Sequence, residues 1–137
     1  MTPEENEIVE KLVTTFPDFG VIWKKYLESE IEDEDDEEYI SLYSVASEFS
    51  EYVINLYHEK ETEKLKKAFS EIELLSINGS EYISEVALVG FIEGILILRS
   101  HEGIALDAFD SWLGESSKEF WYGMHDFFTK GTESENN

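Results

Sequence analysis

The pattern of apolar and polar positions has one long apolar segment, residues 86–98, in a chain that is otherwise rich in polar and acidic residues. The apolar stretch begins at Tyr82 and Ile83 and contains no Pro or Asn-Gly, and its length favours a helix over a strand. A helix that is apolar on nearly all sides is buried. The segment is shorter than the ~20 apolar residues that a bilayer requires, and Glu93 interrupts it. It therefore predicts a buried central helix near residues 80–100.

The first thirty residues predict two amphipathic helices. Thr2, Pro3 and Glu5 are typical of a helix start with a capping box. This helix is expected to end before Pro17, because the residue preceding a proline avoids the α region. Asp18 is then expected to cap the second helix. The buried face expected for that helix comprises Phe19, Ile22, Trp23, Tyr26 and Leu27.

An acidic segment and two further helices follow. Residues 28–38 contain nine carboxylates in eleven positions, which predicts a solvated acidic loop. Residues 39–76 contain no Gly or Pro, but their apolar positions fall into two stripes of different phase. The first stripe is Leu42, Ala46, Phe49, Val53 and Leu56, and the second is Leu65, Ala68, Phe69, Ile72 and Leu75. The phase change predicts two antiparallel helices joined by a tight turn near residues 58–62.

The remaining sequence predicts the central helix and two more helices. Asn78-Gly79 is a turn signal, Ser80 is expected to cap the central helix, and Gly103 is expected to end it. Residues 105–113 are expected to form a short helix whose inward aromatic residues are Phe109 and Trp112. Residues 116–119 have the spacing of a capping box and begin a last helix that Gly131 is expected to end. The apolar face expected for that helix comprises Phe120, Trp121, Met124, Phe127 and Phe128.

Together these patterns predict an all-α fold of about seven helices, packed as helical hairpins around the buried central helix. We expect a single all-helical domain over residues 1–131, with the acidic loop at 28–38 and a disordered tail at 132–137. A chain of 137 residues is long enough to bury one core without disulfides or a structural metal.

The net charge of the chain bears on its function. Its formal net charge is −22, from 32 acidic and 10 basic residues. Such a field repels nucleic acids and anionic membrane surfaces and attracts basic partners, so we expect neither direct nucleic-acid binding nor membrane association. The hydrophobic content of 42% is too high for a disordered chain. The absence of Cys and of a basic, apolar N-terminal signal predicts a cytoplasmic protein.

Glu93 is the candidate for acid–base chemistry, because an ionisable group among apolar residues is paired, protonated or placed at an exposed edge. One interpretation is a general acid or base with a raised pKa. The other is an edge carboxylate bonded to Arg99, a Lys or a Tyr hydroxyl. Gly90 and Gly94 flank it on one face and are expected to let a neighbouring helix or a Trp ring approach closely.

Metal and cofactor sites have no signature in this sequence. Asp33, Asp35 and Glu37 alternate like the first ligands of an EF-hand, but the loop lacks the Gly and the closing Glu of that motif. The histidines His58, His101 and His125 lie in separate predicted elements without a partner at ligand spacing. We therefore expect no cofactor, no dedicated metal site and no enzymatic activity.

A partner-binding surface is the functional feature that the sequence favours. Aromatic residues directly follow the acidic run, and rings beside carboxylates combine contact area with electrostatic steering. The residues predicted to bind the partner are Asp33, Asp35, Asp36, Tyr39 and Tyr43.

Four segments carry a family resemblance: residues 69–75 (FSEIELL), 78–83 (NGSEYI), 90–94 (GFIEG) and 112–121 (WLGESSKEFW). They resemble a group of small, acidic, all-helical bacterial proteins that includes immunity proteins of polymorphic toxin systems. The resemblance implies a cytoplasmic neutraliser of a protein partner and supplies no binding residue.

The leading hypothesis is an immunity protein that neutralises a basic toxin domain through acidic complementarity. Two alternatives stay open. One is a structural or adaptor protein, and the other is a small helical enzyme in which Glu93 converges with Glu73 or Glu85. The oligomeric state has no signal in the sequence.

Overall fold

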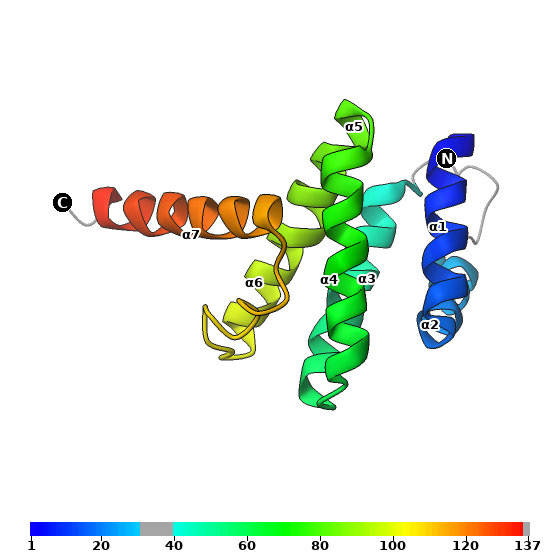
Figure 1. Cartoon of the computed structure of the whole chain (residues 1–137), viewed down its shortest axis with the longest axis horizontal. Helices are drawn as coiled ribbons and strands as arrows, with labels where there is room; N and C mark the ends of the chain where they lie inside the picture. The colour runs from blue at the N-terminus through cyan, green and yellow to red at the C-terminus, as the bar shows by residue number, and fades with distance from the viewer. Residues whose placement is uncertain (31–39, 136–137) are drawn as a thin grey trace.

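The computed structural model describes the backbone of residues 1–30 and 40–135, and side chains as far as residue 130. Within these residues the fold is all-helical, as predicted, and contains no strand. The elements are α1 (Pro3–Thr15), α2 (Pro17–Glu30), α3 (Leu42–His58), α4 (Thr62–Asn78), α5 (Glu81–Glu85), η2 (Val86–Ile92), α6 (Glu93–His101) and α7 (Glu115–Glu135). Figure 1 shows α1 and α2 beside the bundle of α3, α4 and the central helix, with α7 projecting from the other side.

The central helix consists of α5, η2 and α6 joined end to end, and it forms the middle of the core as predicted. Its buried residues are Ile83, Val86, Ala87, Phe91, Ile92, Ile95 and Leu96. The middle part, η2, is a π-helix that packs against α3, α4, α5 and α7. There the Glu93 N–H bonds to the Leu88 carbonyl, five residues back. The π register is a feature that the apolar pattern does not predict.

Helix α1 follows the prediction, whereas the role of Asp18 in α2 differs from it. Thr2 and Glu5 form the expected capping box. The first helix ends at Thr15 and the second begins at Pro17, as expected from the proline. Helix α2 begins at Pro17, so Asp18 lies inside its first turn and is not the cap. The Asp18 carboxylate instead accepts a hydrogen bond from the Tyr52 hydroxyl at 2.7 Å, which ties α2 to α3.

Helix α2 buries less of its predicted face and continues further than expected. Phe19 and Trp23 are buried, whereas Ile22, Tyr26 and Leu27 are half-buried. The helix continues to Glu30, so the first three positions of the predicted acidic loop are helical. The rest of that loop lies outside the described residues.

The break between α3 and α4 is where the phase change predicted it. Helix α3 ends at His58 and α4 begins at Thr62, and Lys60 in the turn has a φ of 60°. Every residue of the two predicted stripes is buried except Leu75, which is half-buried. The antiparallel pair was therefore predicted from apolar positions alone.

The prediction of a short helix at residues 105–113 is wrong. The central helix ends before Gly103, as predicted. Gly103 has a φ of 70°, a backbone conformation that glycine adopts readily. The chain then forms a series of turns. The Trp121 indole donates to the Leu106 carbonyl at 3.1 Å, and an α-helix would have used that carbonyl internally. Phe109 is fully buried as predicted, against the rings of Phe69 and Trp121.

Helix α7 begins and ends differently from the prediction. It starts at Glu115, and the Glu73 side chain caps it in place of the predicted capping box. Its backbone continues through Gly131 to Glu135. Trp121 is buried, but Phe127 and Phe128 are 67% and 40% exposed, which contradicts their predicted inward position. The reason is visible in Figure 1, where the far part of α7 extends beyond the helices that could cover it.

Candidate protein-interaction surface

Two tyrosines form the candidate site where α3 meets α5. Tyr43 lies in the first turn of α3 and Tyr82 lies in α5, and their ring centroids are 6.4 Å apart in an edge-to-face arrangement. Both rings are partly open to solvent, with exposed fractions of 36% and 43%. Large aromatic side chains with an open face are typical contact residues of protein interfaces.

Local hydrogen bonds hold Tyr43 in place. Its backbone N–H bonds to the hydroxyl of the N-cap residue Ser41 at 3.2 Å. The next N–H toward the N-terminus, that of Leu42, bonds to the Glu5 carboxylate of α1 at 3.2 Å. The ring of Tyr43 lies over Gly90 of η2, where a Cβ atom would be 3.2 Å from it. The start of α3 is therefore fixed by α1 and by the central helix.

Carboxylates surround the two rings. Burial, and then the charges of Glu85 and Glu93, raise the pKa of Tyr43. Burial raises the pKa of Tyr82 as well, together with the charge of Glu5, whose carboxylate accepts a bond from the Tyr82 hydroxyl at 3.4 Å. Both phenols thus stay neutral to a higher pH than usual. The surface presents neutral aromatic rings in a negative field, which suits a cationic group.

The central helix packs closely beneath this surface. A Cβ atom at Gly90 would lie 3.0 Å from the Cβ of Ala46, and one at Gly94 would lie 2.7 Å from the hydroxyl of Ser50. The two glycines therefore admit a neighbouring helix, α3, as predicted. The Ser50 hydroxyl donates to the Ala46 carbonyl at 2.7 Å and is 3.3 Å from the Phe91 carbonyl of η2.

The two tyrosines lie in the part of the chain that matches a protein family. The model of one family, Domain of unknown function (DUF7674), matches residues 9–129. The chain belongs to this family. No curated protein and no solved structure matches the chain. The DUF7674 match includes Tyr43, Tyr82, Glu85 and Glu93, and begins after Glu5.

Of the residues predicted to bind a partner, Tyr43 is the one that the DUF7674 structure describes. Asp33, Asp35, Asp36 and Tyr39 lie outside the described residues. The other residues of this surface were not among those predicted to bind a partner: Glu5, Tyr82, Glu85 and Glu93. The spacing of three between Tyr82 and Glu85 puts them on one side of a helix, but no sequence signal indicates that this side faces the start of α3.

Of the three carboxylates considered for an enzyme, two lie near Tyr43 and the third caps α7. Glu85 and Glu93 both act on Tyr43, and Glu93 is half-buried at the edge of the core. Glu73 accepts hydrogen bonds from the backbone N–H groups of Ser116 and Ser117 at 2.8 and 3.2 Å. Of the partners considered for Glu93, Arg99 does not bond to it, because the Arg99 guanidinium bonds to backbone carbonyls.

The described residues contain neither a cluster of metal ligands nor a membrane-spanning helix. There, no group of three or more His, Asp or Glu side chains is placed to hold a metal ion. No helix in the described ranges has the length and apolar composition needed to cross a membrane.

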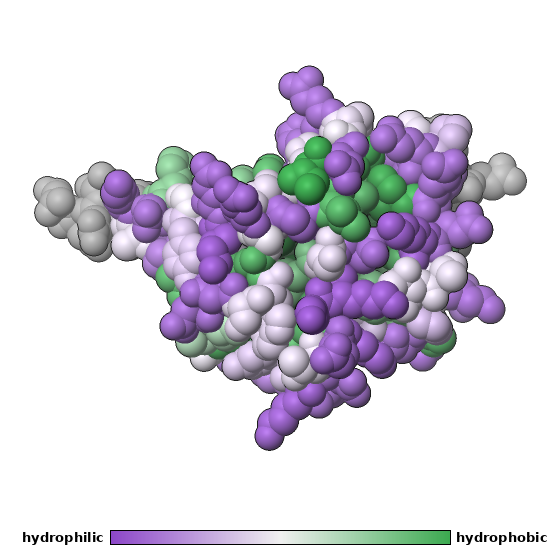
Figure 2. Space-filling model, in the orientation of Figure 1, coloured by the Kyte–Doolittle hydropathy of each residue, from purple (hydrophilic) through white to green (hydrophobic). Residues whose placement is uncertain are grey.

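The outer surface is mostly polar. Figure 2 shows hydrophilic residues over much of one face and an apolar patch near the end of α4 that leads to α5. Leu74 and Ile77, in the last turns of α4, are 41% and 61% exposed. Leu74 also lines a shallow pocket with Ile8 of α1.

Proposed function

We propose that this DUF7674 domain is a cytoplasmic protein-binding module that captures a basic partner. The binding surface would comprise the Tyr43 and Tyr82 rings, the carboxylates beside them, and the acidic segment that precedes α3. Following the sequence resemblance, the proposed partner is a basic toxin domain, and the domain would act as its immunity protein.

The observation that carries this proposal is the pair of partly exposed tyrosines beside Glu85 and Glu93. A Lys or Arg side chain seated on the rings would gain a cation–π contact and an ion pair at the same time. Such contacts are worth more once the partner excludes water from them. The site therefore selects a cation presented on a protein surface that covers it.

The charge of the whole chain supports the same partner class. A net charge of −22 raises the encounter rate with a basic protein and disfavours acidic competitors. As an immunity protein, the domain would occupy the active cleft of a basic toxin domain with its carboxylates. The short-range contacts at Tyr43 and Tyr82 would then set how slowly the complex dissociates.

The experiment is affinity capture from the native host, using the immobilised domain and identification of bound proteins by mass spectrometry. A variant with Tyr43→Ala and Tyr82→Ala is compared with the wild type. Phe127→Ala serves as the matched control, because Phe127 is an exposed aromatic residue on α7, at a different part of the molecule. Circular dichroism checks that all three proteins fold.

We expect a basic protein that the wild type and Phe127→Ala retain and that the double variant loses. Its affinity for the purified double variant should be lower by at least tenfold, as for the loss of an aromatic anchor. Recovery of a toxin domain, whose toxicity co-expression of this protein suppresses, would support the immunity role. A basic partner without toxicity would favour the adaptor alternative, and equal capture by the double variant would contradict the proposed surface.

A further inference from the structure

A pocket between the end of α6 and the middle of α7 differs in charge from the rest of the molecule. Its volume is about 280 Å³, and its lining residues are Leu96, Ile97, Arg99, Ser100, His101, His125, Phe128 and Thr129. No carboxylate belongs to this lining, although the chain carries 32 of them. More than twenty residues separate His101 from His125 in the sequence, so the spacing of the histidines did not predict this pocket.

The single arginine of the chain is the main polar group of this pocket. Its Nε–H donates to the Leu96 carbonyl at 3.1 Å, and Nη1 donates to the Ile104 carbonyl at 3.3 Å. Among the described residues, no carboxylate lies within ion-pair distance of the Arg99 side chain. A guanidinium has five N–H donors, so three remain after these two bonds. Nη2 forms neither of these two bonds, and no buried polar side-chain atom in the described residues lacks a partner, so Nη2 is open to solvent.

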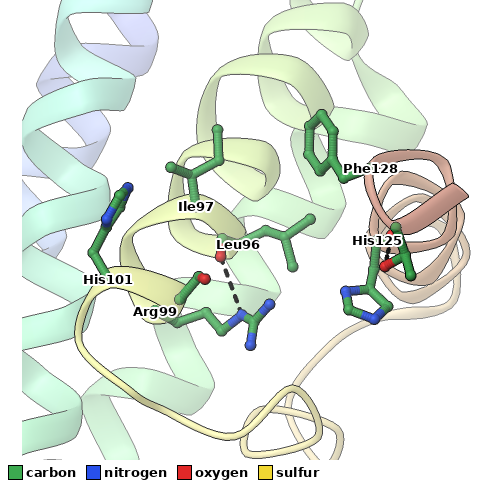
Figure 3. A pocket seen from close by; sticks show the side chains of 8 residues that line it. Leu96, Ile97, Arg99, His101, His125 and Phe128 are labelled. Carbon is green, nitrogen blue, oxygen red and sulfur yellow. Dashed lines mark hydrogen bonds between the residues drawn. The ribbon is translucent and has the colours of Figure 1, made fainter. Parts of the chain in front are cut away.

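The two carbonyl bonds also fix the direction of the guanidinium. Figure 3 shows Arg99 and His125 pointing toward one another across the pocket, with His101 turned away on the other side of α6. An imidazole has at least one N–H donor in every protonation state. The Thr129 hydroxyl donates to the His125 carbonyl at 2.9 Å and can still accept a bond. The polar end of the pocket is thus donor-rich and held in place before any ligand arrives.

The other walls of the pocket are apolar. Leu96 is buried at its base, Ile97 is 43% exposed, and Phe128 of α7 faces the same space. A ligand that fits must therefore carry an acceptor group at one end and a hydrocarbon or ring at the other. The volume is close to the lower end of the range for ligand pockets, so the pocket suits a small ligand.

We propose that this pocket is a binding site for a small organic carboxylate with an apolar body. The planar carboxylate would lie against the free edge of the Arg99 guanidinium, a pairing that two parallel N–H···O bonds favour. His125 would donate a further bond, and the apolar body would contact Ile97 and Phe128. This site is separate from the proposed protein-binding surface and does not depend on it.

The test uses benzoate as the probe, with benzamide as the uncharged analogue of the same shape and inorganic phosphate as an anion without an apolar body. Binding to the full chain is measured by calorimetry and by the amide chemical shifts of Ser100 and Thr129, which line the pocket. The variants are Arg99→Lys, which keeps the charge but loses the planar edge, and His125→Leu. His58→Gln is the matched control, because His58 pairs with Glu102 on another surface.

We expect saturable shifts with benzoate, and binding that is at least tenfold weaker for benzamide and for Arg99→Lys. His125→Leu should weaken benzoate binding as well, and His58→Gln should bind as the wild type does. Because Arg99 also holds two backbone carbonyls, His125→Leu keeps the test decisive if Arg99→Lys fails to fold. Absence of saturable shifts, equal binding of benzamide, or equal binding of phosphate would overturn the proposal.

Discussion

At the scale of single residues, two glutamates hold the helices together by capping helix starts that are distant in sequence. Glu5 accepts bonds from the N–H of Thr2, the N-cap of its own helix, and from that of Leu42, 37 residues away. Glu73 accepts the N–H of Ser116, 43 residues away. A carboxylate is favoured at a helix N-terminus by its unpaired N–H groups and by the helix dipole. The local half of the Glu5 cap was predictable from its spacing, whereas its bond to α3 depends on tertiary packing.

Glu5→Gln should make stability depend less on pH. Burial, the largest influence, would raise the pKa of Glu5, but its hydrogen bonds with Thr2, Leu42 and Tyr82 bring it below the ordinary value of 4.5. Folding therefore favours the charged form, and this stabilisation is complete above pH 4.5 and lost as the pH falls through the lower folded-state pKa. We expect the variant to be about 1 to 2 kcal/mol less stable at neutral pH, and this difference to shrink in acid.

Urea unfolding at several pH values measures this difference, with Glu4→Gln as the control. Glu4 is exposed in the same turn of α1 and carries the same charge. A constant gap between wild type and Glu5→Gln from neutral to acidic pH would show that the carboxylate charge contributes nothing to the cap.

Gly114→Ala should disturb the other capping carboxylate. A Cβ atom at this position would overlap the side chain of Glu73, which then could not keep its bonds to the start of α7. We expect a loss of about 1 to 3 kcal/mol in the free energy of unfolding. Gly123→Ala is the opposite case, because this glycine lies within α7 and its Cβ would meet no atom within 4 Å. That variant should be more stable by about 0.5 to 1 kcal/mol, so thermal melts that move both variants in the same direction would refute the argument.

At the scale of elements, apolar periodicity predicted what depends on burial and missed what depends on hydrogen-bond register. The stripes of α3 and α4 placed both helices and the turn between them. The π register of η2 was not predictable. In a uniformly apolar segment, the sequence looks the same whether each N–H bonds to the carbonyl four residues back or five residues back. The turns at residues 105–113 were missed because the bond from Trp121 to the Leu106 carbonyl is tertiary.

Ile95→Ala tests whether the central helix is the core of the fold. Ile95 is fully buried, and emptying such a site costs about 2 to 5 kcal/mol. Ile97→Ala, on the same helix but 43% exposed, should cost less than about 0.5 kcal/mol. Chemical denaturation of the two variants gives the comparison, and similar small losses for both would mean that α6 contributes little to the core.

At the scale of the whole molecule, the chain combines an ordinary helical core with a large excess of negative charge. The sequence predicted the core and one residue of the described candidate surface, Tyr43. It could not predict the contact of Tyr43 with Tyr82, because these residues meet only when α3 packs against the central helix. The pocket around Arg99 was unpredictable for the same reason, since His125 reaches it from α7.

The excess charge should act mainly on the rate of association with a basic partner. Replacing the five acids from Asp33 to Glu37 with Asn or Gln lowers the local charge by five and relieves self-repulsion, so the fold should be unchanged or slightly more stable. With the partner obtained by capture, the association rate of this variant should be lower than that of the wild type at low salt. The difference between the two rates should be smaller at physiological salt, where the Debye length is ~8 Å. Tyr43→Ala should instead raise the dissociation rate, because a ring contact acts only after the surfaces meet. Surface plasmon resonance at two salt concentrations separates these effects, and an unchanged association rate at low salt would limit the acidic run to a role in solubility.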